Sequence, residues 1–372
     1  MKKRGFEAIA TLVGTVIGAG VLGIPYVVAQ SGFFTGLVNV VLIGVLILIL
    51  KLYLGEVVLR TKGNHQLTGY AEKYLGKTGK KIMTFVMLFG IYGALLAYLI
   101  GEGEAFSAIF GGSSFLYSIG FFIFASLLIF AGLKLIKKYE LFLTGVIFLI
   151  VILISFLSFK YVDLNNITGF NLGNIFLPYG VILFAFLGTA AIPEMKEILC
   201  NHKKRLKKCI ITGSLLVIGV YLLFTFFVVS VTGINTTEIA TVGLGNVLGP
   251  KMLLLGNLFA IFAMATSFLT LGLALKQMYD YDYGFSKNLS WALTCFVPLG
   301  LFLLNFRSFI KTIGYVGSIA GGLDGILIVL MAWKAVKKGD RKPEYEIVKG
   351  KWLGIVLISV FVLGILYQLF NV

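Results

Sequence analysis

The sequence predicts an all-α integral membrane protein with eleven transmembrane helices, arranged as two inverted five-helix repeats and one extra helix at the C-terminus. Three observations lead to this prediction: the composition, the distribution of basic residues, and a glycine- and proline-containing motif that occurs twice. Of the 372 residues, 59% are hydrophobic and 13% are charged, whereas a soluble domain is about 45–50% apolar. A soluble fold could not bury that much apolar surface.

Eleven segments are apolar and long enough to cross a bilayer, which takes about 20 residues of helix. They span residues 6–30, 32–59, 82–110, 114–133, 139–159, 174–198, 209–232, 252–279, 287–304, 309–333 and 352–371. The first segment follows three basic residues, as the apolar part of a signal peptide does. It is too long for a signal peptide and has no small-residue cleavage site. We therefore expect it to remain as the first helix.

The Lys and Arg residues are distributed unevenly among the loops. If the N-terminus is cytoplasmic and every segment crosses, 27 of the 32 fall on the cytoplasmic side. This asymmetry follows the positive-inside rule. It predicts a multi-pass protein of the cell membrane with the C-terminus outside, and it accounts for the net charge of +16 without a nucleic-acid partner. The basic run at 203–208 is read in the same way, as a topological anchor, although such runs also bind anionic lipid headgroups.

A short motif in the first segment returns in the sixth. Residues 20–25 read GVLGIP and residues 188–193 read GTAAIP, an offset of 168 residues. An odd number of crossings separates the two segments, so they run in opposite directions. We therefore divide the single domain, 1–372, into repeats at 1–160 and 174–338 and an extra helix at 350–372. Inverted repeats whose first helices are interrupted by Gly and Pro are typical of secondary transporters that bind their substrate at mid-membrane.

The interrupted first segment is also a candidate binding site. Five residues that disfavour helix lie close together in it: Gly14, Gly18, Gly20, Gly23 and Pro25. Relative to alanine, glycine destabilises a helix by about 1 kcal/mol and proline by about 3 kcal/mol. Unwound backbone offers N–H groups to a carboxylate and carbonyls to a cation or an ammonium group. The alternative is that the glycines only allow helices to pack closely.

The eighth segment places Ala263, Thr266 and Ser267 on one face of a helix. Together with carbonyls of the first segment, the two hydroxyls could form an oxygen cage for a hard cation. The alternative is that they bond to carbonyls of their own helix, as Ser and Thr often do.

Acidic residues inside spans are functional candidates, because placing one at the membrane centre costs about 2.5–3.5 kcal/mol of insertion free energy. Glu102 and Glu104 point about 200° apart on a helix. Glu104 is preferred because it shares a face with small residues at 93, 97, 101 and 108, and Glu102 is expected to reach toward the outer interface. Asp324 shares a face with glycines at 317, 321 and 325. Each acid could carry a proton, bind an ion or make a structural hydrogen bond, whereas Glu56 is expected to pair with Arg60.

The rest of the sequence argues against an enzyme. The two histidines, His65 and His202, lie in basic loops, and there is no Ser-His-Asp set, metal-ligand cluster or phosphate loop. The three cysteines are not expected to form disulfides, and no cofactor is expected beyond a coupling ion. Residues 66–75 predict a short interfacial helix. Residues 233–251 are either a lid over an outer entrance or an ordinary connection.

Four stretches resemble the hydroxy and aromatic amino acid permeases and their amino acid/auxin permease relatives. They read GTVIGAGVLGIPY at 14–26, YAEKYLGK at 70–77, FAFLGTAAIPE at 184–194 and ATSFLTLGLAL at 265–275. The resemblance implies a leucine-transporter-like inverted-repeat fold. It implies substrate contacts in the first segment at Gly18, Ala19 and Gly20, and in the sixth at Phe186, Gly188 and Thr189.

The resemblance also implies a sodium site, if the one typical of this fold is kept. Its ligands would be carbonyls at Gly14, Ile17 and Ala263 and the hydroxyls of Thr266 and Ser267. Some proton-coupled relatives place a lysine in the fifth span where sodium would sit, and 139–159 contains none. That difference favours sodium. Bacterial aromatic permeases are thought to use protons, however, and Glu104 or Asp324 could relay one.

The hypothesis from sequence is therefore an amino acid:cation symporter that imports a neutral amino acid, with aromatic ones among the candidates, by alternating access. The alternative is a membrane sensor that keeps the pocket without transport. The coupling ion, the particular amino acid and the oligomeric state stay open.

Overall fold

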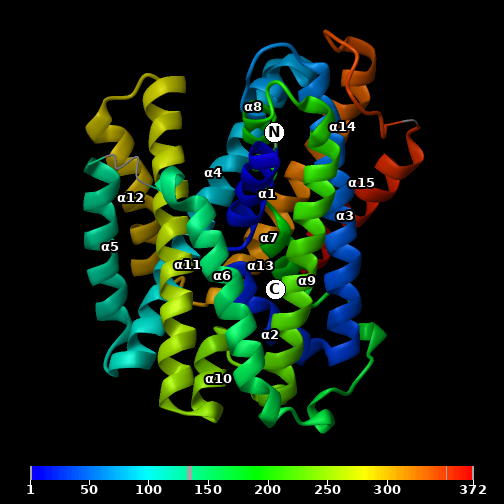
Figure 1. The fold of residues 1–372 in the computed structure, drawn as a ribbon. Coiled ribbons are helices and arrows are strands. Elements are labelled where there is room, and N and C mark those ends of the chain that lie inside the picture. The colour runs from blue at the N-terminus through cyan, green and yellow to red at the C-terminus, as the bar shows by residue number, and fades with distance from the viewer. Residues whose placement is uncertain (1, 132–135, 349, 371–372) are drawn as a thin grey trace.

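The computed structural model describes residues 2–131, 136–348 and 350–370, and this part of the chain contains helices and no strand (Figure 1). The helices are α1 (Lys2–Val16), α2 (Gly20–Ser31), α3 (Phe33–Arg60), α4 (Leu67–Phe110), α5 (Ser114–Ala131), α6 (Ile136–Ser158), α7 (Tyr179–Phe186), α8 (Ala191–Ile198), α9 (Leu206–Thr232), α10 (Ala240–Leu248), α11 (Pro250–Gln277), α12 (Lys287–Leu303), α13 (Phe309–Tyr315), α14 (Gly322–Lys338) and α15 (Trp352–Phe370). Two π-helical segments, η6 (Met278–Asp282) and η7 (Val316–Gly321), follow α11 and α13.

The helices confirm a multi-pass membrane protein. In the described ranges, seven are long and apolar enough to cross a bilayer, and α1 with α2 adds an eighth as one span bent by 56°. Of the other three expected spans, 139–159 corresponds to α6, which has 23 residues, 174–198 to α7 and α8 with a break between them, and 287–304 to α12, which has 17 residues. The number eleven therefore stays a prediction. Many large apolar side chains are exposed along α3, α5, α6 and α15, where a bilayer would cover them.

The short helix expected at 66–75 is confirmed as the first part of α4. Gly76, with φ +80° and ψ −171°, separates it from the longer part of the helix. This left-handed backbone favours glycine over any residue with a side chain. The Tyr74 hydroxyl lies 2.7 Å from that of Thr61, at the end of α3, and this contact fixes the short helix against the bundle.

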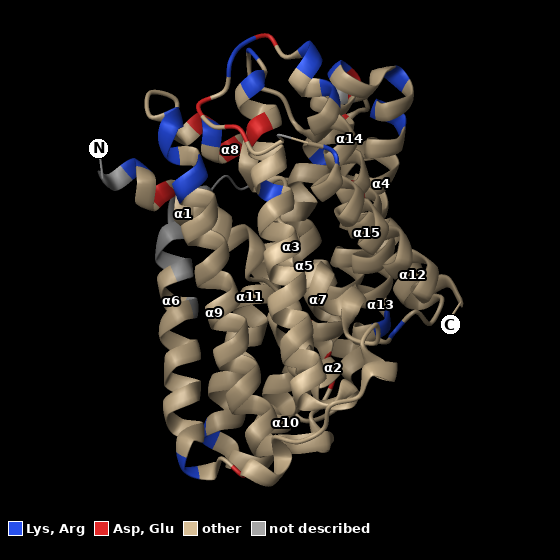
Figure 2. Ribbon diagram, turned by 90° about the vertical axis from the view of Figure 1, so that its right-hand side faces the viewer, with Lys and Arg blue, Asp and Glu red and all other residues tan. Residues whose placement is uncertain are grey.

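Most of the Lys and Arg residues lie at one end of the bundle, which we call the basic end (Figure 2). Residues 339–348, which follow α14, contact α3 there. The Glu56 carboxylate accepts the N–H groups of Ile347 at 2.6 Å and Val348 at 3.0 Å, and it pairs with Arg60 at 2.8 Å. The predicted Glu56–Arg60 pair is confirmed, and Glu56 also holds this segment in place.

A second carboxylate ties the same segment to α4. Asp340 pairs with Lys73 and accepts the N–H of Lys62 at 2.8 Å. These two donors, the Lys73 ammonium first, lower the pKa of Asp340. The basic end is therefore crosslinked by acids from both α3 and 339–348.

The stretch 233–251 folds as a short 3-10 turn followed by α10, which packs against α11. Glu238 accepts the N–H of Ile310 at 3.1 Å, near the start of α13. This contact attaches the stretch to the bundle in the described conformation, and it fits either a closed lid or an ordinary connection.

Candidate functional site

The two interrupted helices meet near the middle of the bundle. One break lies at 17–19 between α1 and α2, and the other at 187–190 between α7 and α8. A Cβ atom added to Gly20 would lie 2.5 Å from the Ala185 Cα, and one added to Gly188 would lie 2.5 Å from the Val16 Cγ2. Gly188 also has a φ of +121°. The glycines therefore serve both expected roles: they interrupt the helices and they let them approach closely.

A tyrosine on α9 joins the two breaks. The Tyr221 hydroxyl, which has a single proton, makes a bifurcated hydrogen bond to the Val16 carbonyl at 3.0 Å and the Ala185 carbonyl at 2.9 Å. Its side chain is fully buried, and its ring centroid lies 4.9 Å from that of Phe186. Sequence reasoning missed this residue. A buried Tyr hydroxyl needs a partner, but nothing in the sequence indicates that the partners are the ends of α1 and α7.

The first break also faces α4 and α11. A Cβ atom on Gly18 would lie 3.0 Å from the Ser267 Oγ and 3.6 Å from the Tyr98 hydroxyl oxygen. Two residues predicted from separate motifs, Gly18 and Ser267, are thus neighbours. Tyr98 is buried and was not predicted. A leucine at position 18 would displace both hydroxyls.

The Thr266 hydroxyl adopts the alternative considered for it. It donates to the carbonyls of Phe262 at 2.8 Å and Ala263 at 3.1 Å in its own helix. A hydroxyl that donates still has lone pairs to offer. Thr266 and Ala263 are therefore adjacent, as the predicted cage requires. Ile17 is buried and Gly14 half-buried at the end of α1, and their carbonyls stay predicted ligands.

The second break is bonded to α14. The Thr189 hydroxyl donates to the Asp324 Oδ2 at 2.8 Å, and the other carboxylate oxygen is buried without a partner in the described part of the chain. The structure thus brings together a predicted substrate residue and a predicted proton-coupling residue. Ala19 and Phe186 are also buried, each beside one of the breaks.

One expectation for the two α4 carboxylates is wrong, that for Glu102, and the role of Glu104 stays a prediction. Glu102, expected near the outer interface, has an exposed fraction of 0%, and neither of its oxygens has a partner among the described residues. Glu104, expected to face the pathway, is half-buried. Part of the small-residue face of α4 packs against other helices: Gly93 lies against Val316, and Gly101 lies against Met264. These two glycines permit close helix packing.

These features match a known family. The profile of the tryptophan/tyrosine permease family matches residues 1–369. The chain belongs to this family. Its similarity to the tyrosine-specific transport system 1 of Haemophilus influenzae is 27% identity, over 95% of this chain and 92% of that one. It is 26% identical to the glutamine transporter 2 of Aliivibrio fischeri, over 86% of each chain. The permease is therefore a transport protein and not an enzyme.

The fold also matches a solved structure. The crystal structure of MhsT in complex with L-phenylalanine aligns with 98% of this permease and 97% of that chain, with a TM-score of 0.71 and 15% identity. This likeness confirms the leucine-transporter-like fold that the sequence motifs implied. The relatives are named as transport proteins, so the sensor alternative has no support from them. In the described ranges, no three His, Cys, Asp or Glu side chains are grouped to hold a metal ion.

Proposed function

We propose that this permease imports a neutral amino acid together with a cation by alternating access. In this proposal the eleven spans form a 5+5 inverted repeat, 1–160 and 174–338, with 350–372 as an extra helix. The N-terminus and the basic end lie in the cytoplasm and the C-terminus lies outside, in the plasma membrane. The observation that carries the proposal is the meeting of two interrupted helices at Tyr221, because one hydroxyl there connects backbone from both proposed repeats.

The substrate carboxylate would bind at the start of α2. The N–H groups of Val21 and Leu22 donate to the carbonyls of Gly18 and Ala19. The N–H groups of Ala19 and Gly20 come just before them and have no backbone acceptor in the described part of the chain. Unpaired N–H groups at a helix N-terminus attract an anion. The first break is thus suited to a carboxylate.

The substrate side chain would lie toward the second break, against Phe186, Gly188 and Thr189. The Phe186 ring packs on Tyr221 and lies close to Gly44 of α3. An apolar wall of this kind suits an aromatic side chain. The relatives are named for tyrosine and for glutamine, so both side chains are candidates.

The proposed coupling ion is sodium at Gly14, Ile17, Ala263, Thr266 and Ser267, with a proton at Asp324 or Glu104 as the alternative. The sodium ligands would be neutral oxygens from carbonyls and hydroxyls, which a hard cation accepts. Ser267 supports this site because its hydroxyl lies beside Gly18 at the first break. The Thr189–Asp324 hydrogen bond supports the proton alternative, since it couples an ionisable group to the second break.

Uptake into proteoliposomes tests the function. Labelled tyrosine, tryptophan, phenylalanine and glutamine are supplied under separate sodium and proton gradients. We expect accumulation of at least one of them under one gradient, and competition among the four then ranks the substrates. If none accumulates under either gradient, the symport proposal is wrong. Gly18→Leu should abolish uptake, because its side chain would fill the first break, and wild-type uptake by that variant would locate the site elsewhere.

A further inference from the structure

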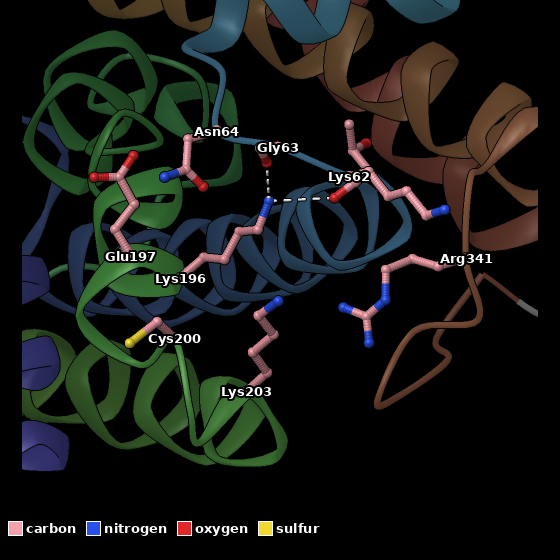
Figure 3. A pocket seen from close by; sticks show the side chains of 9 residues that line it. Lys62, Gly63, Asn64, Lys196, Glu197, Cys200, Lys203 and Arg341 are labelled. Atoms are coloured by element: carbon pink, nitrogen blue, oxygen red, sulfur yellow. Dashed lines mark hydrogen bonds between the residues drawn. The ribbon is translucent and has the colours of Figure 1, made fainter.

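A cavity of about 260 Å³ opens at the basic end, beside α8. Its lining comes from three parts of the chain that are distant in sequence: the α3–α4 connection, α8 with its following loop, and Arg341, which follows α14. Four cationic side chains line it, with one acid: Lys62, Lys196, Lys203 and Arg341, and Glu197. Figure 3 shows Lys203 and Arg341 extending toward the space beside Lys196, while Glu197 extends away from Arg341. The cavity is therefore strongly electropositive.

Lys196 is the most constrained of these cations. Its exposed fraction is 4%, and its Nζ donates to the carbonyls of Gly63 at 2.6 Å and Thr61 at 3.2 Å (Figure 3). An ammonium group has three donors, so one is left for the cavity. These bonds tie α8, the second half of an interrupted helix, to the end of α3. We call this contact the Lys196 clasp.

Arg341 supplies a second unused donor. Its Nη2 donates to the Glu344 Oε1 at 2.8 Å, but its Nη1 is buried without an acceptor in the described part of the chain. Buried donors normally have a partner. A second cavity shares Lys203 and Arg341 with the first and adds Lys204 and Arg205. Positive charge therefore continues from the clasp to the surface of the basic end.

We propose that this cavity binds a compact oxyanion, a phosphate group or a carboxylate, between Lys196, Lys203 and Arg341. Such an anion would accept the spare N–H groups and reduce the repulsion among the cations around the clasp. Its binding would hold α8 against α3 and so favour the state closed at the basic end. The anion could come from a free phosphate or from the carboxylate of an amino acid leaving the transport path. Two parts of this inference rest on the proposed function: the transported amino acid as a source of the carboxylate, and the location of the cavity on the cytoplasmic side. Binding of an oxyanion does not rest on it.

Cys200 provides a native probe of this site. It lines both cavities and is exposed, whereas Cys209 and Cys295 are buried. Its thiol also accepts from the Arg4 guanidinium at 3.5 Å. A pocket lined by one sign of charge raises the local concentration of counter-ions about 10- to 1,000-fold. A negatively charged methanethiosulfonate should therefore label Cys200 faster than a positively charged one, relative to their rates on free cysteine.

The experiment measures both labelling rates on the purified full-length protein in vesicles of zwitterionic lipid. We expect the anionic-to-cationic rate ratio to exceed that of free cysteine about tenfold or more, and to fall several-fold in Lys203→Gln and Arg341→Gln. Lys208→Gln is the matched control, since this exposed lysine lies on the same end but does not line either cavity. It should keep the wild-type ratio.

Two protection arms then identify the anion. Inorganic phosphate and tyrosine are added separately at constant ionic strength, and we expect at least one of them to slow labelling in the wild type but not in Arg341→Gln. Protection by phosphate indicates a free phosphate, and protection by tyrosine indicates the transported carboxylate. A rate ratio equal to that of free cysteine, or protection by neither compound, overturns the proposal. Labelling requires no transport, so this result is independent of the uptake assay.

Discussion

Replacing Tyr221 with phenylalanine tests whether the two breaks act as one unit. The substitution removes a single oxygen and leaves the ring in place, so it creates no large cavity. The Val16 carbonyl also accepts the Gly18 N–H at 3.1 Å, whereas Tyr221 is the one donor found for the Ala185 carbonyl in the described structure. The variant therefore leaves the carbonyl at the end of α7 without its donor.

The size of the effect follows from that carbonyl. An unsatisfied buried acceptor costs about 1–3 kcal/mol. If substrate binds only when both breaks are ordered, the same energy appears as about a 5- to 150-fold loss of affinity. Equilibrium binding of labelled substrate to the purified protein measures it, with thermal unfolding as a check on stability.

Tyr179→Phe is the matched control for Tyr221→Phe. Tyr179 lies at the start of α7, and its hydroxyl is buried with no partner in the described chain. Removing it should cost nothing, because no hydrogen bond is lost. The reasoning is refuted if Tyr221→Phe binds substrate within about twofold of wild type, or if Tyr179→Phe loses as much affinity.

Three further substitutions test separate parts of the site. Gly20→Ala should destabilise the protein by about 1–3 kcal/mol in thermal or denaturant unfolding, because its Cβ would meet the α7 backbone at 2.5 Å. Thr266→Ala should raise the sodium concentration that half-saturates uptake about tenfold, the effect of losing about 1.4 kcal/mol at the cage. Asp324→Asn should keep the Thr189 hydrogen bond and the stability, but lose uptake driven by a proton gradient.

Each of these predictions has a contrasting outcome. Gly120→Ala is the control for Gly20→Ala, since nothing lies within 4 Å of a Cβ there, and equal losses in both variants would contradict close packing at the first break. An unchanged sodium requirement in Thr266→Ala would exclude that hydroxyl from an ion site. Unchanged proton-driven uptake in Asp324→Asn would leave Asp324 with a structural role only.

The interruptions of the helices were predictable from sequence because their cause is local. Glycine and proline disfavour helix, and Gly18 and Gly188 lie in the two breaks, at 17–19 and 187–190. The motif at 20–25 directly follows the first break and the motif at 188–193 begins in the second, whereas Gly20 and Pro193 themselves are helical. The Glu56–Arg60 pair was predictable for the same reason, since it depends on spacing within one helix. The short helix before Gly76 was predictable as well, because the apolar residues of 66–75 are near helical spacing.

The residues that complete the site were not predictable in this way. Tyr221 is 205 positions from Val16, and Tyr98 contacts Gly18 through the packing of α4 on the first break. Sequence spacing carries no signal for such contacts. Tertiary packing also buries Glu102, which helical spacing alone had placed toward the outer interface.

The buried carboxylate of Glu102 is a further candidate for a proton carrier on α4, beside Glu104, which the sequence favoured. Glu102 lies one helical turn from Tyr98, which borders the first break, and no described residue bonds to its carboxylate oxygens. Its protonation can change without breaking a hydrogen bond. If Glu102 carries the proton, Glu102→Gln should leave stability unchanged and flatten the pH dependence of uptake, whereas Glu104→Gln should leave the profile as it is. If Glu104→Gln alters the profile and Glu102→Gln does not, the sequence-based preference for Glu104 was correct after all.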